Sequence, residues 1–174
     1  MVDKRSFRAK VYEVAEELGI EQTKVIRIIS SYFDYCRHDL YCGRIVRILG
    51  FAYIEPNVIF DDFINTTAMY CKMVSENSNV TYHTVREVMR TYFEVCKADL
   101  LNGKSVDFRT LCTLHPIVDQ ENRVVKVHVS LSALIFSRLD TELSGVTSAR
   151  AHLCKVFKNE LRSQSFVEVL SSDR

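Results

Sequence analysis

A segment of about 60 residues occurs twice in this chain. The stretch YFDYCRHDLYCGRIVRILGFAYIEP (32–56) returns as YFEVCKADLLNGKSVDFRTLCTLHP (92–116), displaced by 60 positions with no gap. Unrelated segments of average composition would share roughly one or two of these 25 positions, whereas here eight are identical. The identical pairs are Tyr32/Tyr92, Phe33/Phe93, Cys36/Cys96, Asp39/Asp99, Leu40/Leu100, Gly43/Gly103, Val46/Val106 and Pro56/Pro116. A repeat with a fixed spacing constrains the fold strongly, and this one predicts a single structural unit present twice.

The first unit is predicted to run helix, helix, strand. Apolar residues recur at spacings of three and four from Phe7 to Leu18, with Asp3 as the expected N-cap and Gly19 at the end. The next helix has a wide apolar face and ends at Gly43. That face comprises Val25, Ile28, Ile29, Tyr32, Phe33, Cys36 and Leu40. One strand is expected over 45–54, with a bulge at Gly50 and an end at Pro56.

The second unit repeats this order and continues further. Helices are expected over about 62–76 and, after the N-cap Thr81, over 85–100, followed by a strand over 105–114. A turn at 119–122 and alternating valines at 125, 127 and 129 predict a return strand, and a helix then extends to about residue 143. The first unit has no comparable return strand or third helix. A last amphipathic helix is expected over 149–162.

The order of elements resembles the HU/IHF family of bacterial DNA-bending proteins. The residues that carry the resemblance are VAEELGIEQTKVIRIISSYFDYCRHDLYCGRIVRILGFAYIEP and, in the second unit, ENRVVKVHVSLSALIFSRL. Members of the family are intertwined dimers, and tailed phages, including crAss-like phages, encode similar proteins. The resemblance therefore implies an α+β fold of two tandem HU/IHF-like units, each helix-helix-β-hairpin, packed as a pseudo-dimer. The expected divisions are a first unit at 1–58, a second at 59–144, and a C-terminal helix and tail at 145–174.

The repeated aromatic residues are the expected contact between the two units. The resemblance implies that the long helices pack together through Tyr32, Phe33, Cys36, Tyr92, Phe93 and Cys96. An ordinary hydrophobic core would bury the same side chains, so both interpretations predict that they are inaccessible to solvent.

The sequence departs from the family where the family bends DNA. Bending needs long β-arms whose tip prolines wedge between base steps. Pro56 and Pro116 lie at strand ends instead, and the turn at 119–122 holds two acidic residues and no proline. Dedicated DNA-binding domains are usually strongly basic, whereas this chain has a net charge of +1, and Asp107 replaces Arg47 in the second unit. The candidate phosphate contacts are Arg44, Arg47, Lys104, Arg109, Arg123 and Lys126.

No pattern in the sequence indicates catalysis. The five histidines are scattered without metal-ligand spacing, and there is no P-loop or nucleophile elbow. We therefore expect a non-enzymatic protein with no catalytic residues, metal site, cofactor or small-molecule substrate. The six cysteines show no CxxC pair and are interpreted as reduced. With no 18-residue apolar run and no secretory signal, the expected location is intracellular (cytoplasmic) or in a virion, not secreted and not in a membrane.

Two functions follow as hypotheses. The first is a structural or assembly protein that reuses the HU/IHF fold, in the form of an oligomeric neck or tail ring component of a tailed phage virion. Its partners would be further copies of the chain or other assembly proteins. The apolar face expected to contact a neighbour is Leu153, Val156, Phe157 and Leu161. The alternative is a nucleoid-associated protein that contacts the phosphates of double-stranded DNA without arm-mediated bending.

Overall fold

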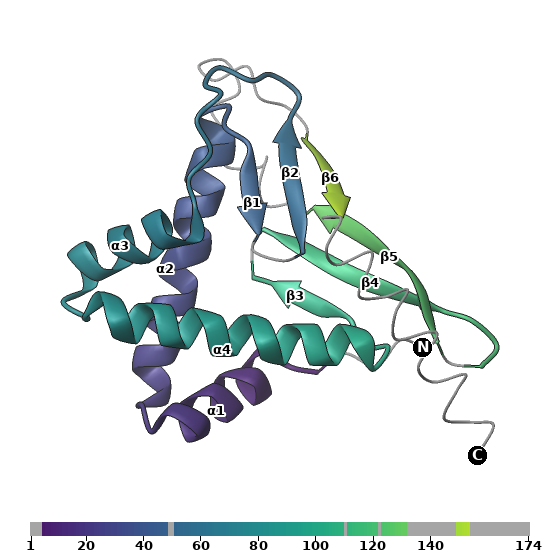
Figure 1. Ribbon diagram of the computed structural model, residues 1–174, viewed down its shortest axis with the longest axis horizontal. Coiled ribbons are helices and arrows are strands. Elements are labelled where there is room, and N and C mark those ends of the chain that lie inside the picture. Colours follow the sequence, from purple (N-terminus) through teal and green to yellow (C-terminus); the bar gives the residue numbers. More distant parts are fainter. Residues whose placement is uncertain (1–4, 49–50, 110, 122, 132–148, 154–174) are drawn as a thin grey trace.

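The chain folds into helices packed against two small antiparallel sheets, as a computed structural model shows (Figure 1). The structure describes residues 5–48, 51–109, 111–121, 123–131 and 149–153. Within them the helices are α1 (Phe7–Leu18), α2 (Gln22–Tyr41), α3 (Thr67–Ser78) and α4 (Tyr82–Leu101). The strands are β1 (Val46–Ile48), β2 (Ala52–Pro56), β3 (Val106–Phe108), β4 (Cys112–Val118), β5 (Val124–Leu131) and β6 (Ala149–Leu153). This is the α+β class that the sequence predicts.

Helix termini recur at the 60-residue spacing. The Ser6 hydroxyl caps α1 by accepting a hydrogen bond from the Ala9 backbone at 3.1 Å, and Thr66 caps α3 in the same way from Met69 at 3.3 Å. Asp3, the expected cap, lies outside the described residues. The helix predicted over about 62–76 begins about one turn later than expected, at Thr67, because Thr66 supplies its N-cap.

The single strand predicted across Gly50 is two strands. β1 and β2 pair antiparallel, with Val46 opposite Ile54 and Ile48 opposite Ala52. The second unit forms the same hairpin between β3 and β4, so the strand predicted over 105–114 is also wrong. In each hairpin the residue before the second strand donates its backbone N–H three residues back, Phe51 to Ile48 and Leu111 to Phe108, both at 3.0 Å. Gly50, the expected bulge, lies outside the described residues.

The predicted helix over 149–162 is wrong where the structure describes it. Residues 149–153 form β6, which pairs antiparallel with β2 so that Leu153 lies opposite Ala52 and Ala149 opposite Pro56. The two sheets have the orders β1-β2-β6 and β3-β4-β5. Each sheet therefore has three strands, but the first receives its third strand from the C-terminal part of the chain.

The helices of the two units pack crosswise. α1 contacts α4 as well as α2, and α3 contacts α2 as well as α4. Figure 1 shows α2 crossing α4 in the left half of the view, with the two sheets to the right of α2. Short edge strands explain why proline is tolerated in each sheet: β1 pairs only with 52–54 and β3 only with 112–114, so Pro56 and Pro116 lie beyond their reach.

Candidate interaction surfaces

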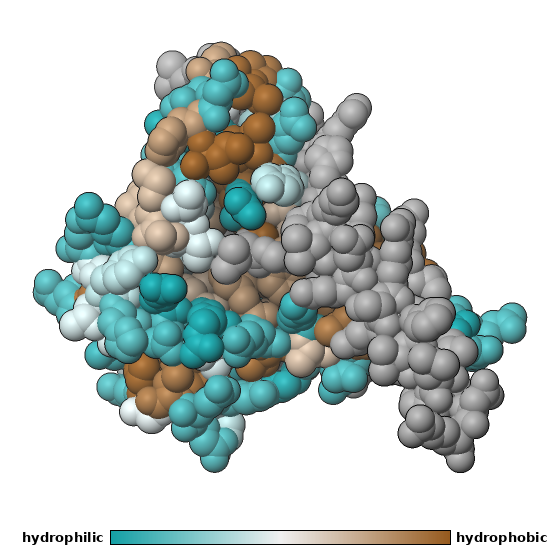
Figure 2. Space-filling model, viewed as in Figure 1, coloured by the Kyte–Doolittle hydropathy of each residue, from teal (hydrophilic) through white to brown (hydrophobic). Residues whose placement is uncertain are grey.

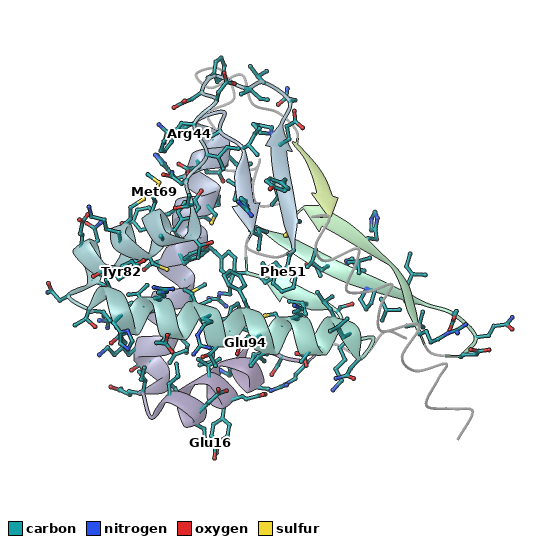
Figure 3. The ribbon with its side chains drawn as sticks, viewed as in Figure 1. Glu16, Arg44, Phe51, Met69, Tyr82 and Glu94 are labelled. Carbon is teal, nitrogen blue, oxygen red and sulfur yellow. The ribbon has the colours of Figure 1, made fainter. Side chains whose placement is uncertain are left out.

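The repeated aromatic side chains lie in the core between the two units. All six residues expected at the unit contact are buried. The Tyr32 ring lies 5.8 Å from that of Phe93, and the Phe33 ring lies 6.2 Å from that of Tyr92, in edge-to-face geometry. Phe51, labelled in Figure 3, extends this cluster toward the sheets through Phe93 at 5.9 Å.

A buried carboxylate joins the units beside this cluster. Asp39 of α2 is only 2% exposed, and its Oδ2 accepts hydrogen bonds from the Tyr70 hydroxyl and the Asn65 amide, both at 2.6 Å. Its Oδ1 accepts from Arg44 at 3.3 Å. Burial raises the pKa of the Tyr70 phenol, so this group stays protonated and keeps donating to Asp39. Because Tyr70 belongs to α3, the network fixes α3 onto α2.

The repeat-equivalent carboxylate has different partners. Asp99 of α4 accepts a hydrogen bond from Arg5 at 3.3 Å through Oδ1. The position of Tyr70 is taken by Lys10 of α1, which is fully buried. Within the described part of the chain, neither the Lys10 ammonium nor Asp99 Oδ2 has a hydrogen-bond partner. The two units thus keep the buried aspartate but not the residues around it.

Two of the six candidate phosphate contacts are engaged by carboxylates. The Arg44 Nε lies 3.0 Å from Asp61, in addition to its contact with Asp39. These contacts raise the pKa of Arg44, with the hydrogen bond to Asp61 as the main cause. Arg123 lies 2.8 Å from Asp119 and 3.0 Å from Glu121 in the β4–β5 turn. Neither guanidinium is a free cation for a phosphate.

The other four candidates lie on or beside different elements. Arg47 is exposed on β1, with its guanidinium 5.6 Å from the centre of the Tyr53 ring. Arg109 follows β3 and lies 4.2 Å from the Phe7 ring of α1. Lys104 is half-buried after α4, and its backbone N–H donates to the Asp99 carbonyl at 2.9 Å. Lys126 lies in β5 opposite Ile117, and its side chain is outside the described part of the structure.

A loop between β2 and α3 exposes large apolar side chains. We call Ile59, Phe60 and Phe63 the apolar loop; their exposed fractions are 40%, 63% and 49%. The Phe60 backbone N–H donates to the Gly43 carbonyl at 3.0 Å, and Asp61 is bound by Arg44, so the loop is fixed onto the end of α2. Figure 2 shows brown and tan surface at the top and upper left, where this segment runs in Figure 1. This surface was not predicted from the sequence, although the segment NVIFDDF (57–63) places three large apolar residues in a short stretch between a strand and a helix.

A second, smaller apolar exposure lies on the β4–β5 hairpin. Ile117 and Val118 are 46% and 43% exposed at the end of β4. The turn beyond them is closed by Asp119, whose carboxylate accepts from the backbone N–H groups of Glu121 and Arg123, both at 2.9 Å. These hydrogen bonds hold the pKa of Asp119 below its usual value, with the Arg123 backbone as the main cause. The hairpin ends in a fixed, acidic turn.

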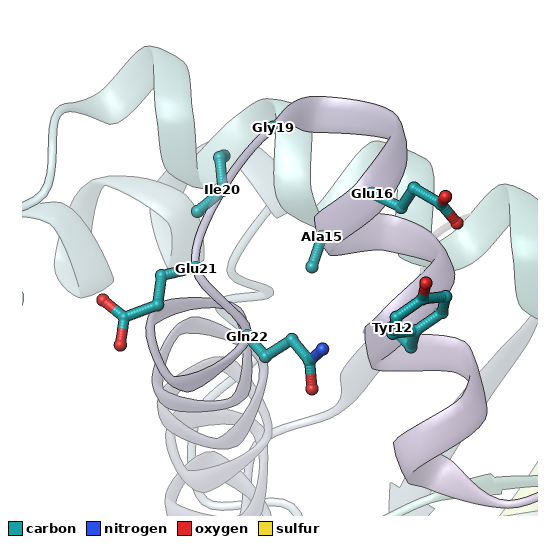
Figure 4. A pocket seen from close by; sticks show the side chains of 7 residues that line it. All are labelled: Tyr12, Ala15, Glu16, Gly19, Ile20, Glu21 and Gln22. Carbon is teal, nitrogen blue, oxygen red and sulfur yellow. The ribbon is translucent and has the colours of Figure 1, made fainter.

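A cavity of about 440 Å³ opens where α1 meets α2 (Figure 4). Its lining residues are Tyr12, Ala15, Glu16, Gly19, Ile20, Glu21 and Gln22. The polar groups among them are two carboxylates, the Tyr12 phenol and the Gln22 amide. In Figure 4 the Glu16 and Glu21 carboxylates point away from each other.

The described residues contain no group of three or more histidine, cysteine, aspartate or glutamate side chains placed to hold a metal ion. Cys36, Cys71, Cys96 and Cys112 are buried free thiols, and Cys42 is exposed. Burial raises the pKa of Cys71 to about 11 and that of Cys96 to about 12, which keeps both thiols protonated at neutral pH. The buried cysteines therefore behave as small apolar residues.

Of the four residues predicted to form the oligomer contact, the structure describes only Leu153. Leu153 lies in β6, opposite Ala52, rather than on a helix. Val156, Phe157 and Leu161 lie outside the described residues. No helix in the described part of the chain combines the length and the apolar character needed to cross a membrane.

Comparisons with protein-family models, with curated proteins and with solved structures found no match for this chain.

Proposed function

We propose that this chain is a non-enzymatic structural protein that reuses an HU/IHF-like fold for assembly, as an oligomeric neck or tail ring component of a tailed phage virion. The observation that carries the proposal is the contrast at the loop between β2 and α3. There Arg44, a candidate phosphate contact, is bound by Asp61 and Asp39, while Phe60 beside it is 63% exposed. The positive charge of Arg44 is therefore bound by carboxylates of the same chain, whereas the ring of Phe60 is exposed to solvent.

The arrangement of elements supports a pseudo-dimer of two units. α1 packs on α4 and α3 packs on α2, so each unit places its first helix against the long helix of the other. The two hairpins and the helix caps recur at the same spacing of 60 residues. A single chain that already contains both halves of an intertwined dimer has no need of a second copy to complete its core. Its outer surfaces are then available for higher-order contacts.

The apolar loop is the surface best suited to such a contact. Large contiguous apolar patches on a protein surface often mark interaction sites, and Ile59, Phe60 and Phe63 are exposed close together in sequence. Burying a Phe or Ile side chain stabilises by about 1.5–3 kcal/mol, so a few such residues at the centre of an interface contribute a large part of its affinity. The loop is also fixed by the hydrogen bond from Phe60 to Gly43, which lowers the entropy lost on binding.

The alternative function is binding of double-stranded DNA without bending. One observation favours it: Arg47, a candidate phosphate contact, is exposed on β1 beside Tyr53. Phosphate-driven binding depends on neutralising many phosphates, and two of the six candidate contacts, Arg44 and Arg123, are bound by carboxylates of the chain itself.

The test is the mass of the protein in solution, measured by light scattering with and without a generic DNA duplex of about 40 base pairs at about 0.15 M salt. The assembly function predicts a discrete oligomer whose mass is the same with and without DNA. A single chain that binds the duplex at low salt, and loses it as the salt concentration rises, would reverse the order of the two functions.

A further inference from the structure

The first sheet is completed by a strand from a distant part of the chain. In the second sheet β5 follows β4 after a turn of five residues, 119–123. In the first sheet the strand that follows β2 in space is β6, and the whole of residues 57–148 stands between them in sequence. The equivalent strands of the two units thus differ in how they are connected.

β6 occupies the side of β2 that β1 leaves open. Ala52 and Ile54 of β2 are fully buried, and β1 covers only residues 52–54 on the other side. Five residue pairs join β2 to β6, from Ala52 with Leu153 to Pro56 with Ala149. Without this pairing the backbone N–H and C=O groups along that side of β2 would form an open sheet edge, which promotes pairing with another chain.

The pairing does not depend on which copy of the chain supplies the strand. It is a backbone ladder, and strand addition from a second chain forms the same ladder. Between the end of β5 at Leu131 and the start of β6 at Ala149 the sequence has 17 residues, 132–148. A connection of this length can span roughly 60 Å when extended, about twice the diameter of a small domain. The length of chain therefore allows β6 to reach a neighbouring molecule.

We propose that β6 is an exchangeable strand, and that the segment 149–153 of one copy completes the β1-β2 sheet of another. The partner is a second copy of this chain, and the proposal rests on the assembly function proposed above. When each copy donates its strand to one neighbour and accepts a strand from another, the contact is head-to-tail. Such a contact closes into a ring when the rotation between neighbours allows it, and otherwise extends as a filament.

The test uses two single-cysteine changes that face each other across the ladder. Tyr53 and His152 are direct partners in the β2–β6 register, and cross-strand partners have Cα atoms about 4.5–5.5 Å apart, within the range that a disulfide bridges. Chains carrying Tyr53→Cys and chains of distinguishable mass carrying His152→Cys are mixed in denaturant, refolded together and oxidised. Both also carry Cys42→Ser and Cys154→Ser, since Cys42 is exposed and Cys154 is close to position 152 in sequence.

Strand exchange predicts a hybrid disulfide between the two kinds of chain, seen by mass under non-reducing conditions. The matched control replaces Tyr53→Cys by Arg47→Cys. Arg47 is the partner of Tyr53 on β1, so it lies one strand further from β6, at about 10 Å, and no hybrid is expected. The proposal is overturned if the mixture yields no hybrid, whether or not a single chain carrying both Tyr53→Cys and His152→Cys closes a disulfide within itself.

The masses of the same mixtures before oxidation separate this proposal from the function on which it rests. Oligomers without a hybrid disulfide overturn strand exchange and leave the assembly function standing. Single chains without a hybrid overturn both. Oligomers with a hybrid disulfide, absent from the Arg47→Cys control, support both.

Discussion

Asp39 is a buried, charged residue at the contact between the two units. Its carboxylate is almost completely buried and receives donors from α3, from the segment before α3 and from Arg44. A buried carboxylate that loses a donor keeps its desolvation cost without compensation. The effect of removing each donor therefore measures how firmly α3 is attached to α2.

Tyr70→Phe removes one donor and leaves the ring in place. We expect the free energy of unfolding to fall by about 1–3 kcal/mol, because Asp39 Oδ2 then retains only the amide of Asn65. Urea denaturation followed by circular dichroism measures the change. The matched control is Tyr35→Phe, whose hydroxyl accepts an exposed hydrogen bond from Asn77 and whose loss should cost less than about 0.5 kcal/mol. Equal losses in the two variants would show that Asp39 does not depend on Tyr70.

At the scale of the element, Gly43 ends α2 and supports the apolar loop. Its φ is +71°, and a Cβ placed there would lie 2.4 Å from Cδ2 of Phe60. Gly19 ends α1 at a φ of +64° with nothing within 4 Å of the same position. The two glycines share the left-handed conformation, and only Gly43 also has a side chain packed against it.

Gly43→Ala is expected to destabilise the protein more than Gly19→Ala. The Gly19 variant carries only the left-handed strain of about 1–2 kcal/mol, whereas the Gly43 variant must also displace Phe60. Thermal unfolding of both variants against the wild type measures the difference. If Gly43→Ala costs no more than Gly19→Ala, the apolar loop is not held against the end of α2.

The β4–β5 turn should be sensitive to acid through Asp119. Because its folded-state pKa is depressed, the stability that the carboxylate contributes is present above its unfolded value and is lost as the pH falls through the lower, folded value. Wild type is therefore expected to unfold at a higher temperature than Asp119→Asn near pH 7. The gap should narrow as the pH is lowered below about 4, the ordinary range of an aspartate. A gap that stays constant between pH 7 and pH 2 would contradict this role.

Helices α1, α2 and α4 and the return strand β5 could be predicted from the sequence, but the pairing of the strands into two sheets could not. The spacing of Val25, Ile28 and Tyr32 is a property of one segment, so periodicity alone identifies α2. The hairpin turns contain apolar residues such as Phe51 and Leu111, which are buried and look like continuing strand. β6 was missed because its partner β2 is remote in sequence and because helical spacing follows it. Strand pairing of this kind is decided by tertiary contacts rather than by local propensity.

At the scale of the whole molecule, the candidate sites also depend on tertiary contacts that the sequence pattern does not reveal. Composition shows that the chain is nearly neutral, but only the fold shows that Asp61 and Asp119 bind two of the candidate phosphate contacts. The apolar loop, in turn, becomes a surface only because Arg44 and Gly43 fix it beside α2. These contacts join residues from different elements, so no single stretch of sequence contains them.

The apolar loop gives the most direct test of the assembly function. The variant Phe60→Ser with Phe63→Ser removes two aromatic side chains that are 63% and 49% exposed, and it keeps the backbone hydrogen bond from residue 60 to Gly43, so the fold should remain. The matched control is Tyr12→Ser with Tyr82→Ser, which removes two exposed aromatics on α1 and α4. Each buried Phe contributes about 1.5–3 kcal/mol, and 1.4 kcal/mol is a factor of ten in an equilibrium constant.

The decisive measurement is the mass of wild type, loop variant and control by light scattering over a range of concentrations. Wild type and control are expected to form the same oligomer. The loop variant is expected to need a roughly tenfold higher concentration to form it. A wild-type protein that remains a single chain throughout, or a loop variant that assembles as readily as the control, would contradict these expectations.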